Sequence, residues 1–396
     1  MYRRSPHGHM GALLPATLMA LTALLPSAFA AEVPNSLQPA RPGISIGTPP
    51  QPPAVEAISV PSAGLGATAA AWLTRANQIR AMAGLPAVTE TASWSSGDYN
   101  HARYCVKNDY IGHSEDPANL YYTSEGNLAA QNSNVMVSSD INTTDEFAIN
   151  LWMAGPFHGV GIIDPALSQV GFGSYREAIG SFRMAAALDV LRGLGSIPPS
   201  VAFPVAWPGN GAIVDLTTFE GGESPDPLTG CPGYTVPTGQ PISLQVGAGG
   251  TTPSVTAHSF SVGGTPLPHC VFDETTYTNP NATLQSLGRG VLNMRDAVIL
   301  IPRDPLVPGD TYTASITSAG HTTTWSFTVM GGTPPPGDVN GDGGVNVNDV
   351  FYLINSLFAG GPAPVISGDV NGDGAVNVND VFYLINFLFA GGPAPQ

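Results

Sequence analysis

Two stretches near the end of the chain carry the same alternation of hydrophobic and polar positions. Residues 347–358 read V-N-D-V-F-Y-L-I-N-S-L-F, and residues 378–389 repeat this pattern with one change, Phe387 in place of Ser356. The apolar residues recur at the spacing of one helix face, and such a face needs a partner surface. Two matching faces predict two helices that pack on each other.

Residues 66–195 have the patterning of a domain that mixes helices with strands. Phe147, Leu151 and Trp152 recur on one side of a helical stretch, whereas Val-Gly-Phe-Gly at 170–173 is typical of the start of a strand. The composition of 182–194 fits either a helix or a strand. Helices are predicted over 68–83, 92–109 and 145–154, and Gly84-Leu85-Pro86 ends the first of them.

The pattern changes over residues 202–330 to short apolar alternations separated by Gly, Pro and Thr. Ile242–Val246 and Ala297–Ile301 are two of these runs. Short strands divided by turn residues predict a β-sandwich. Two connectors complete the layout, a Pro/Ala-rich linker at 31–65 and a shorter linker at 331–336.

The first 30 residues are predicted to be a secretory signal peptide. Arg3 and Arg4 precede an apolar stretch at 13–25, and Ala28-Phe29-Ala30 provides a small-x-small cleavage site. Pro15 interrupts the apolar stretch, which disfavours the alternative of a membrane anchor. No later segment has the roughly 18 uninterrupted apolar residues of a transmembrane helix. The mature protein is therefore expected to be secreted, in the extracellular space or at the cell surface.

Charge and cysteine content narrow the class of protein further. The net charge of −16 argues against a nucleic-acid partner, which would need a basic patch. Cysteines of an exported chain can form disulfides, and with three cysteines one has no disulfide partner within the chain. We expect Cys231 to pair with Cys270, because both lie in the predicted β domain, and Cys105 to be a buried thiol. His101 shares a helix face with Cys105, and helix packing explains that pair better than a metal site with two ligands.

The loops that precede the two matching helices place oxygen-bearing residues in register. Ca²⁺ takes about 6–8 oxygen ligands, and Gly343 or Gly374 at the sixth position allows a backbone carbonyl at the seventh to join them. A polar linker is the alternative, since Asp-Gly and Asn-Gly are common turn signals, but a linker does not explain ligands kept in register twice. The predicted calcium ligands are Asp338, Asn340, Asp342, Gly344, Asn346 and Asp349, then Asp369, Asn371, Asp373, Ala375, Asn377 and Asp380.

The paired loop–helix repeats resemble a type I dockerin. In that family Asp often stands at the twelfth loop position, where an EF-hand has Glu, and Asp349 and Asp380 fit this variant. The resemblance implies a cohesin-like partner on a scaffold or cell-surface protein, and the duplication implies two nearly equivalent binding faces. By this resemblance the recognition residues are Val347, Asn348, Phe351 and Tyr352, and Val378, Asn379, Phe382 and Tyr383.

Three fragments within 66–195 resemble the CAP (SCP-like) superfamily of cysteine-rich secretory, antigen 5 and pathogenesis-related proteins. They are N-D-Y-I-G-H-S-E-D-P, Y-T-S-E-G-N and L-W-M-A-G-P-F-H-G-V-G-I-I-D-P, in the order that the family shows. The resemblance implies an α-β-α sandwich, and therefore a strand at 182–192. It also implies a cleft containing His113, Glu125 and His158. The fourth cleft residue of the family, an acid after the helix tryptophan, has no match after Trp152, and Glu146 precedes that tryptophan.

The chemistry of the predicted cleft stays open at this point. Two imidazoles and a carboxylate can hold Zn²⁺ with a position left for water. The same side chains can equally form a hydrogen-bonded cluster that orients loops without turnover, or bind a ligand. No His-Glu-x-x-His motif is present, and no Ser-His-Asp or Cys-His set stands out.

The stretch L-I-P-R-D-P-L-V-P-G-D-T-Y-T-A-S-I, followed by T-W-S-F-T-V, resembles bacterial Ig-like domains and suggests a spacer or a second binding surface. The predicted architecture is thus multidomain: a CAP-like α-β-α sandwich, an Ig-like β-sandwich, and a small α dockerin with two EF-hand-like repeats. We expect an exported calcium-binding protein that displays a CAP domain and attaches to a cohesin-like module. The alternatives are a metal-assisted peptidase or cell-wall hydrolase on a dockerin-assembled complex, and binding of a lipid or small ligand by the cleft.

Overall fold

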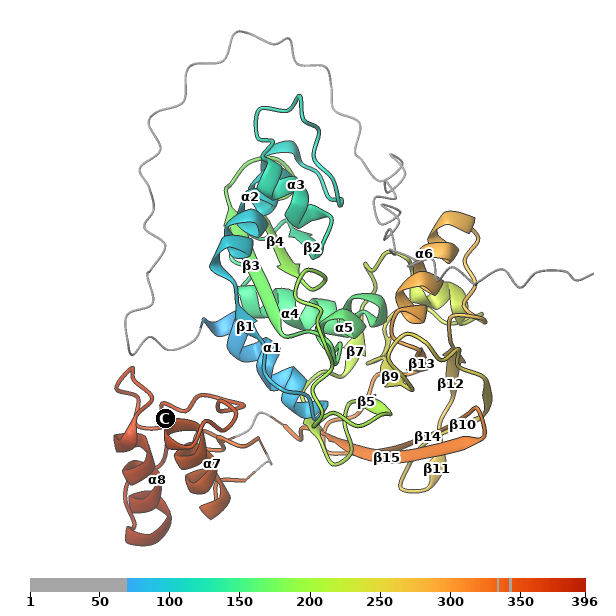
Figure 1. Cartoon of the computed structure of the whole chain (residues 1–396). Helices are drawn as coiled ribbons and strands as arrows, with labels where there is room; N and C mark the ends of the chain where they lie inside the picture. The colour runs from blue at the N-terminus through green and yellow to red at the C-terminus, as the bar shows by residue number, and fades with distance from the viewer. Residues whose placement is uncertain (1–69, 333–334, 342–343) are drawn as a thin grey trace, which may run out of the picture.

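The computed structural model describes residues 70–332, 335–341 and 344–396. The predicted signal peptide, the 31–65 linker and two residues of the first calcium loop, Asp342 and Gly343, lie outside the described residues. The described chain forms a CAP-like unit, a β unit and a pair of helices at the C-terminus (Figure 1).

The CAP-like unit is built on one four-stranded sheet with the order β1-β3-β4-β2. Strand β4 (Met184–Asp189) lies within the stretch that composition left open, so the prediction of a strand there is confirmed. The predicted helices at 68–83, 92–109 and 145–154 correspond to α1, α2 and α4. The elements are α1 (Ala71–Met82), β1 (Thr89–Glu90), α2 (Ala92–Asn108), α3 (Ser124–Ala130), β2 (Ser133–Ser138), α4 (Asp145–Ala154), α5 (Pro156–Ile162), β3 (Gln169–Arg176) and β4 (Met184–Asp189).

Alternation along β4 produces the three layers of this unit. Ala185 and Ala187 face the cluster that contains Cys105 of α2. Met184, Ala186 and Leu188 face the opposite cluster, which contains side chains of α1 and α4. Because successive side chains of a strand point to opposite faces, one short apolar strand serves both helical layers. The sheet therefore lies between α2 on one side and α1 with α4 on the other.

The Val-Gly-Phe-Gly motif has a steric reason in the packing of β3 against α2. A Cβ added at Gly173 would lie 2.0 Å from the backbone nitrogen of Tyr99, and one added at Gly171 would lie 2.6 Å from the Cβ of Trp94. Only glycine lets the strand approach the helix this closely. Phe172, between the two glycines, points the other way and stacks on Trp72 with ring centroids 4.9 Å apart.

The β unit contains two larger sheets, as the alternating pattern of 202–330 predicts. One has the order β11-β10-β14-β15-β6 and the other β12-β13-β9-β5, and β7 pairs with β8. Phe260 and Tyr312 of the first sheet share a buried cluster with Ile242 and Leu300 of the second. The strands are β5 (Val205–Trp207), β6 (Ile213–Val214), β7 (Thr218–Phe219), β8 (Thr238–Gly239), β9 (Ile242–Gln245), β10 (Val255–Val262), β11 (Thr265–Pro266), β12 (His269–Phe272), β13 (Ala297–Pro302), β14 (Thr311–Ser318) and β15 (His321–Val329).

The structure tests both cysteine predictions and adds a helix to the β unit. The Cys231–Cys270 disulfide is present with a Cα–Cα distance of 5.7 Å, and Cys105 is a buried free thiol, so both cysteine predictions are confirmed. Helix α6 (Ala282–Asn293) was not predicted. It begins where the Asn281 side chain accepts hydrogen bonds from the backbone nitrogens of Thr283 and Leu284.

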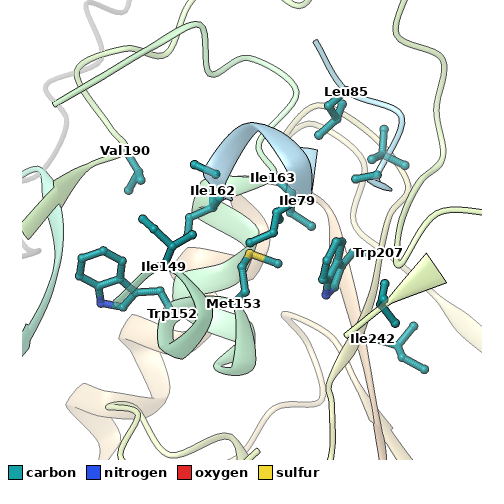
Figure 2. Close-up of a cluster of buried hydrophobic side chains, with 14 of the residues drawn as sticks. Ile79, Leu85, Ile149, Trp152, Met153, Ile162, Ile163, Val190, Trp207 and Ile242 are labelled. Carbon is teal, nitrogen blue, oxygen red and sulfur yellow. The ribbon is translucent and has the colours of Figure 1, made fainter. Parts of the chain in front are cut away.

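The CAP-like unit and the β unit share one hydrophobic core. Met153 and Ile79 of the first unit lie beside Trp207 of the second (Figure 2). Two buried amides cross the same boundary: Gln240 donates to the Met153 carbonyl at 2.7 Å, and Gln245 donates to the Ile163 carbonyl at 2.9 Å. The interpretation of the β unit as a mere spacer is therefore corrected, because separation would expose this core.

The last two helices pack on each other, as their matching faces predict. They are α7 (Val347–Phe358) and α8 (Val378–Ala390), and each begins with a capping box, made by Asn346 with Asp349 and by Asn377 with Asp380. None of the helices in the described part of the chain is long and apolar enough to cross a membrane. Val339, Val350, Leu353, Val370, Val381 and Leu384 form the core of this unit.

Candidate functional site

A pocket at the junction of the CAP-like and β units is lined by both candidate histidines, His113 and His158. His113 follows α2, and its Nδ1 lies 2.9 Å from the Ala130 carbonyl, so Nδ1 carries a proton that it donates. Burial, together with the neighbouring His158, lowers the pKa of His113 to about 4. His113 is therefore a neutral imidazole at physiological pH, and its Nε2 can accept a hydrogen bond.

His158, in the first turn of α5, is held by a carboxylate from the β unit. Oε1 of Glu223 accepts hydrogen bonds from Nδ1 of His158 at 2.8 Å and from its backbone nitrogen at 2.9 Å. A Cβ on Gly155 would lie 2.7 Å from this carboxylate, so glycine leaves room for it. Burial raises the pKa of Glu223, against the opposing effect of its bonds to His158. The carboxylate also lies at the N-terminus of α5, where negative charge is favoured.

Part of the pocket lining is apolar and comes from α6 and Met294, which follows it. Leu287, Val291 and Met294 line this part, and the cavity has a volume of about 100 Å³. Arg295 closes one end and forms a buried ion pair with Asp164, at 2.9 Å. The two units thus line the cleft together, and each gives both kinds of side chain: the CAP-like unit also gives Phe157 and Val190, and the β unit gives Arg295.

The structure does not bring Glu125 to the pocket that His113 and His158 share. Thr123 caps α3, which places Glu125 in the exposed first turn, where it accepts a hydrogen bond from Ser124 Oγ at 3.0 Å. Glu146, in the first turn of α4, is also exposed. Sequence reasoning missed Glu223. This residue, and not Glu125 or Glu146, supplies the carboxylate that contacts His158.

A buried cluster around a third histidine, His101, has a structural role. Nδ1 of His101 is 3.0 Å from Oε1 of Glu115, and its Nε2 is 2.9 Å from the Gly112 carbonyl. Both nitrogens meet acceptors, so the ring is an imidazolium. Burial lowers the pKa of His101, but Cys105 and Glu115 outweigh this effect and raise it to about 10. Glu115 also accepts from the backbone nitrogen of Thr123, and the cluster therefore fixes the loop between α2 and α3.

The two predicted calcium loops repeat the same contacts at their last ligand position. Asp349 accepts hydrogen bonds from the backbone nitrogens of Asn340 and Asn346, at 3.1 and 2.8 Å. Asp380 accepts from those of Asn371 and Asn377, at 3.2 and 2.8 Å. Both aspartates are fully buried. The described parts of the two loops therefore hold the same buried carboxylate in the same way.

The donor set of these loops fits a hard cation. Carboxylates, side-chain amides and backbone carbonyls are the oxygen ligands that Ca²⁺ takes. Asp338, Asp349 and Asp380 are fully buried, and the chain has no Lys or Arg after Arg303 to balance them. Among the residues that the structure describes, which exclude Asp342, no group of three or more His, Cys, Asp or Glu side chains is arranged to hold a metal ion.

The outer faces of the last two helices are apolar and exposed to the same degree. Phe351 is 63% exposed and its counterpart Phe382 is 62% exposed. Exposed apolar side chains grouped in this way mark interaction surfaces. We call these surfaces the α7 face and the α8 face. The α7 face consists of Val347, Phe351 and Phe358, and the α8 face consists of Val378, Phe382 and Phe389.

Comparison with known families locates two of the three units. Residues 73–186 match the model of the Cysteine-rich secretory protein family, and residues 336–389 match that of the Dockerin type I domain. No curated protein matches the chain. The first match includes both cleft histidines and ends before Glu223, and the second includes both predicted calcium loops. The chain thus combines a CAP domain with a type I dockerin, joined by a β unit that neither match covers.

Proposed function

We propose that this chain is an exported attachment protein. Its dockerin folds around Ca²⁺ and binds a cohesin module, and this attachment positions the CAP domain and its cleft. The dockerin implies a cohesin partner and assembly into a complex, and both domains are typical of extracellular or cell-surface proteins. The predicted signal peptide agrees with export. We also propose that the β unit is an Ig-like domain, as the resemblance of its sequence suggests.

The observation that carries the proposal is the duplicated apolar face. Phe351 and Phe382 each expose about two thirds of their surface, at equivalent positions of α7 and α8. Exposed aromatic rings grouped on one small unit, unlike single exposed ones, indicate a surface that a partner covers. Because the two faces are alike, either one is expected to bind the same cohesin.

A binding experiment on the full chain tests this role. Cohesin binding is measured with Ca²⁺, and again after EDTA, for wild type, Phe351→Ser, Phe382→Ser and the double variant. Each single variant is expected to retain binding through its other face, and the double variant is expected to lose it. Phe147→Ser is the matched control, because Phe147 on α4 is 50% exposed and lies in the CAP domain. Undiminished binding by the double variant, or in EDTA, would reject the proposal.

The twelve predicted ligands remain our assignment for two calcium sites. Asp380 also caps α8, so its substitution would disturb the helix as well as the metal site. Asp369 and Asp373 are not part of this cap. Asp373→Asn keeps the size of the side chain and removes one charge from an exposed loop position. Calorimetric titration of this variant is expected to show one Ca²⁺ bound tightly where wild type binds two. Equal titrations would contradict the assignment.

A second candidate role, binding of a small amphipathic ligand, is favoured by the mixed polar and apolar lining of the cleft. His113 and His158 offer hydrogen-bonding groups, whereas Leu287 and Val291 offer apolar surface. Ligand sites of this kind combine an apolar lining with a few placed polar groups. Hydrolysis assisted by Zn²⁺ is the remaining alternative. The predicted zinc site lacks its third ligand, because Glu125 is exposed and lies away from the pocket.

Turnover by the cleft is tested with His113→Ala and His158→Ala. Wild type and both variants are compared on peptide and peptidoglycan substrates with Zn²⁺ added. Equal, background-level turnover in all three proteins would remove the hydrolase alternative. Activity of wild type that both substitutions abolish would replace the binding role with catalysis.

A further inference from the structure

Two histidines of the β unit meet across its two sheets, away from the cleft. His258 is on β10 of the five-stranded sheet, and His269 begins β12 of the four-stranded sheet. Nδ1 of His258 lies 2.8 Å from Nε2 of His269, and the rings are nearly perpendicular, at 83°. His258 is exposed and His269 is half-buried, so water reaches the pair.

The protonation state of His269 follows from its second hydrogen bond. Nδ1 of His269 lies 2.8 Å from the carbonyl of Leu267, and a carbonyl can only accept, so this nitrogen carries the proton. In the neutral ring Nε2 then presents a lone pair toward His258. Metal-binding histidines are oriented in the same way, by donating the other ring N–H to a backbone carbonyl.

The distance between the two nitrogens matches the bite of a metal ion. A borderline divalent cation binds imidazole nitrogen at about 2.0–2.1 Å, so two ligands at a right angle are separated by roughly 2.9 Å. The observed separation of 2.8 Å is close to this right-angle distance, which suits the tetragonal geometry of Cu²⁺. The tetrahedral angle of Zn²⁺ needs about 3.3 Å, so the two nitrogens would move apart to bind that ion.

One N–H proton lies between the nitrogens in the metal-free pair. On metal binding this proton would leave Nδ1 of His258 for solvent, and Nε2 of the same ring would take up a proton from solvent, so the ring would stay neutral. The ion would lie to one side of the line that joins the two nitrogens, and the rings would turn to point both lone pairs at it.

The backbone around the pair holds it in this position. β10 pairs with β14 from Val255 to Val262, and the backbone nitrogen of Leu267 donates to the Phe260 carbonyl at 2.8 Å. The buried ring of Phe260 lies beside His269, with centroids 6.2 Å apart. Little conformational freedom is therefore lost when the two imidazoles bind one ion.

We propose that His258 and His269 form a binding site for a borderline transition-metal ion, Cu²⁺ or Zn²⁺, whose other ligands are water molecules. Imidazole nitrogen selects these ions over the Ca²⁺ that suits the oxygen-rich loops of the dockerin. A bound ion would link the two sheets of the β unit at their edge. The site is independent of cohesin binding and of the cleft.

Titration of the full chain with Cu²⁺, in buffer that keeps Ca²⁺ in excess, tests this site. Affinity is measured by calorimetry and ligand identity by electron paramagnetic resonance, for wild type, His258→Gln, His269→Gln and the control His321→Gln, which changes another exposed histidine. Both site variants are expected to lose the two-nitrogen signal and to bind about tenfold more weakly or worse, since loss of a ligand costs at least as much as loss of the group that orients it. The control is expected to behave as wild type.

Zn²⁺ provides a second readout that does not depend on spectroscopy. Saturating Zn²⁺ is expected to raise the melting temperature of wild type and of His321→Gln, but not that of the two site variants. Comparison of the four proteins without metal shows whether each variant folds. The proposal is overturned if both site variants keep the wild-type copper spectrum and affinity, or if wild type shows no copper signal from two nitrogens.

Discussion

Arg80, in the last turn of α1, is only 1% exposed and donates four hydrogen bonds to backbone carbonyls. Its guanidinium reaches the carbonyl oxygens of Pro86 and Ile162 at 2.8 Å, of Leu167 at 2.9 Å and of Asp164 at 3.0 Å. Burial lowers the pKa of Arg80 to about 10, although Asp164 acts in the opposite direction. The side chain is therefore charged at neutral pH and ties α1 to the segment between α5 and β3.

Arg80→Met keeps an apolar stem of similar length and removes every donor. The Asp164 carbonyl keeps its bond from the Leu167 backbone nitrogen, at 3.1 Å, so three carbonyls lose the donor that Arg80 gave them. Each buried acceptor left without a donor costs about 1–3 kcal/mol. The variant no longer pays for burying a guanidinium, which favours the lower part of that range. We expect the free energy of unfolding to fall by about 3–5 kcal/mol.

Urea unfolding of the full chain in Ca²⁺, followed by tryptophan fluorescence, measures this loss, because Trp72 and Trp152 lie in the affected core. Arg176→Met is the matched control, since Arg176 is one-third exposed and pairs with Asp145 at the surface. The control should cost no more than about 1 kcal/mol. A similar small loss for Arg80→Met would refute the reasoning, because it would mean that the carbonyls find water.

Three further predictions concern pH, the disulfide and the cleft. The folded pKa of His101, about 10, lies above its ordinary value of 6.5, so its stabilisation is complete below pH 6.5 and disappears as pH rises toward 10. The melting temperature of wild type should fall over that range more steeply than that of His101→Gln, and parallel curves would contradict this. Removing the Cys231–Cys270 disulfide by substituting both with alanine should cost about 2–4 kcal/mol in chemical denaturation, whereas an unchanged midpoint would show that it constrains nothing. Glu223→Gln should lower stability by roughly 1–2 kcal/mol and alter ligand binding by the cleft without changing cohesin binding, and a simultaneous loss of cohesin binding would argue against separate sites.

Long elements with clear patterning could be predicted from the sequence, and shorter ones could not. The helices α1, α2 and α4 follow from composition and periodicity, and α7 with α8 from a repeated apolar face. α6 carries two interior glycines, Gly288 and Gly290, each of which costs about 1 kcal/mol relative to alanine, so its propensity argued against it despite several good helix formers. Its start did leave a signal, because Asn281 is a common helix cap. Packing against α5 and β13 evidently compensates for its weak propensity.

The cleft shows a different limit of sequence reasoning. His113 and His158 could be identified because each lies in a fragment that resembles a known family. Glu223 lies in a Gly-Gly-Glu-Ser-Pro loop with no periodicity, and it meets His158 only through tertiary folding across 65 positions. Glu125 carried the expected motif, but the cap at Thr123 directs it to solvent. Local sequence patterns therefore identified the two histidines of the cleft, but not the carboxylate that contacts His158.

The core shared by the CAP domain and the β unit has a consequence for how such proteins can be recombined. A gene fusion or a protease that separated the chain near residue 195 would divide one folded body and expose Met153, Trp207 and Ile242. The last two helices have a separate core of their own, so loss or exchange of the C-terminal unit would leave the shared core covered. We therefore expect a recombination that keeps the CAP domain folded to keep the β unit with it.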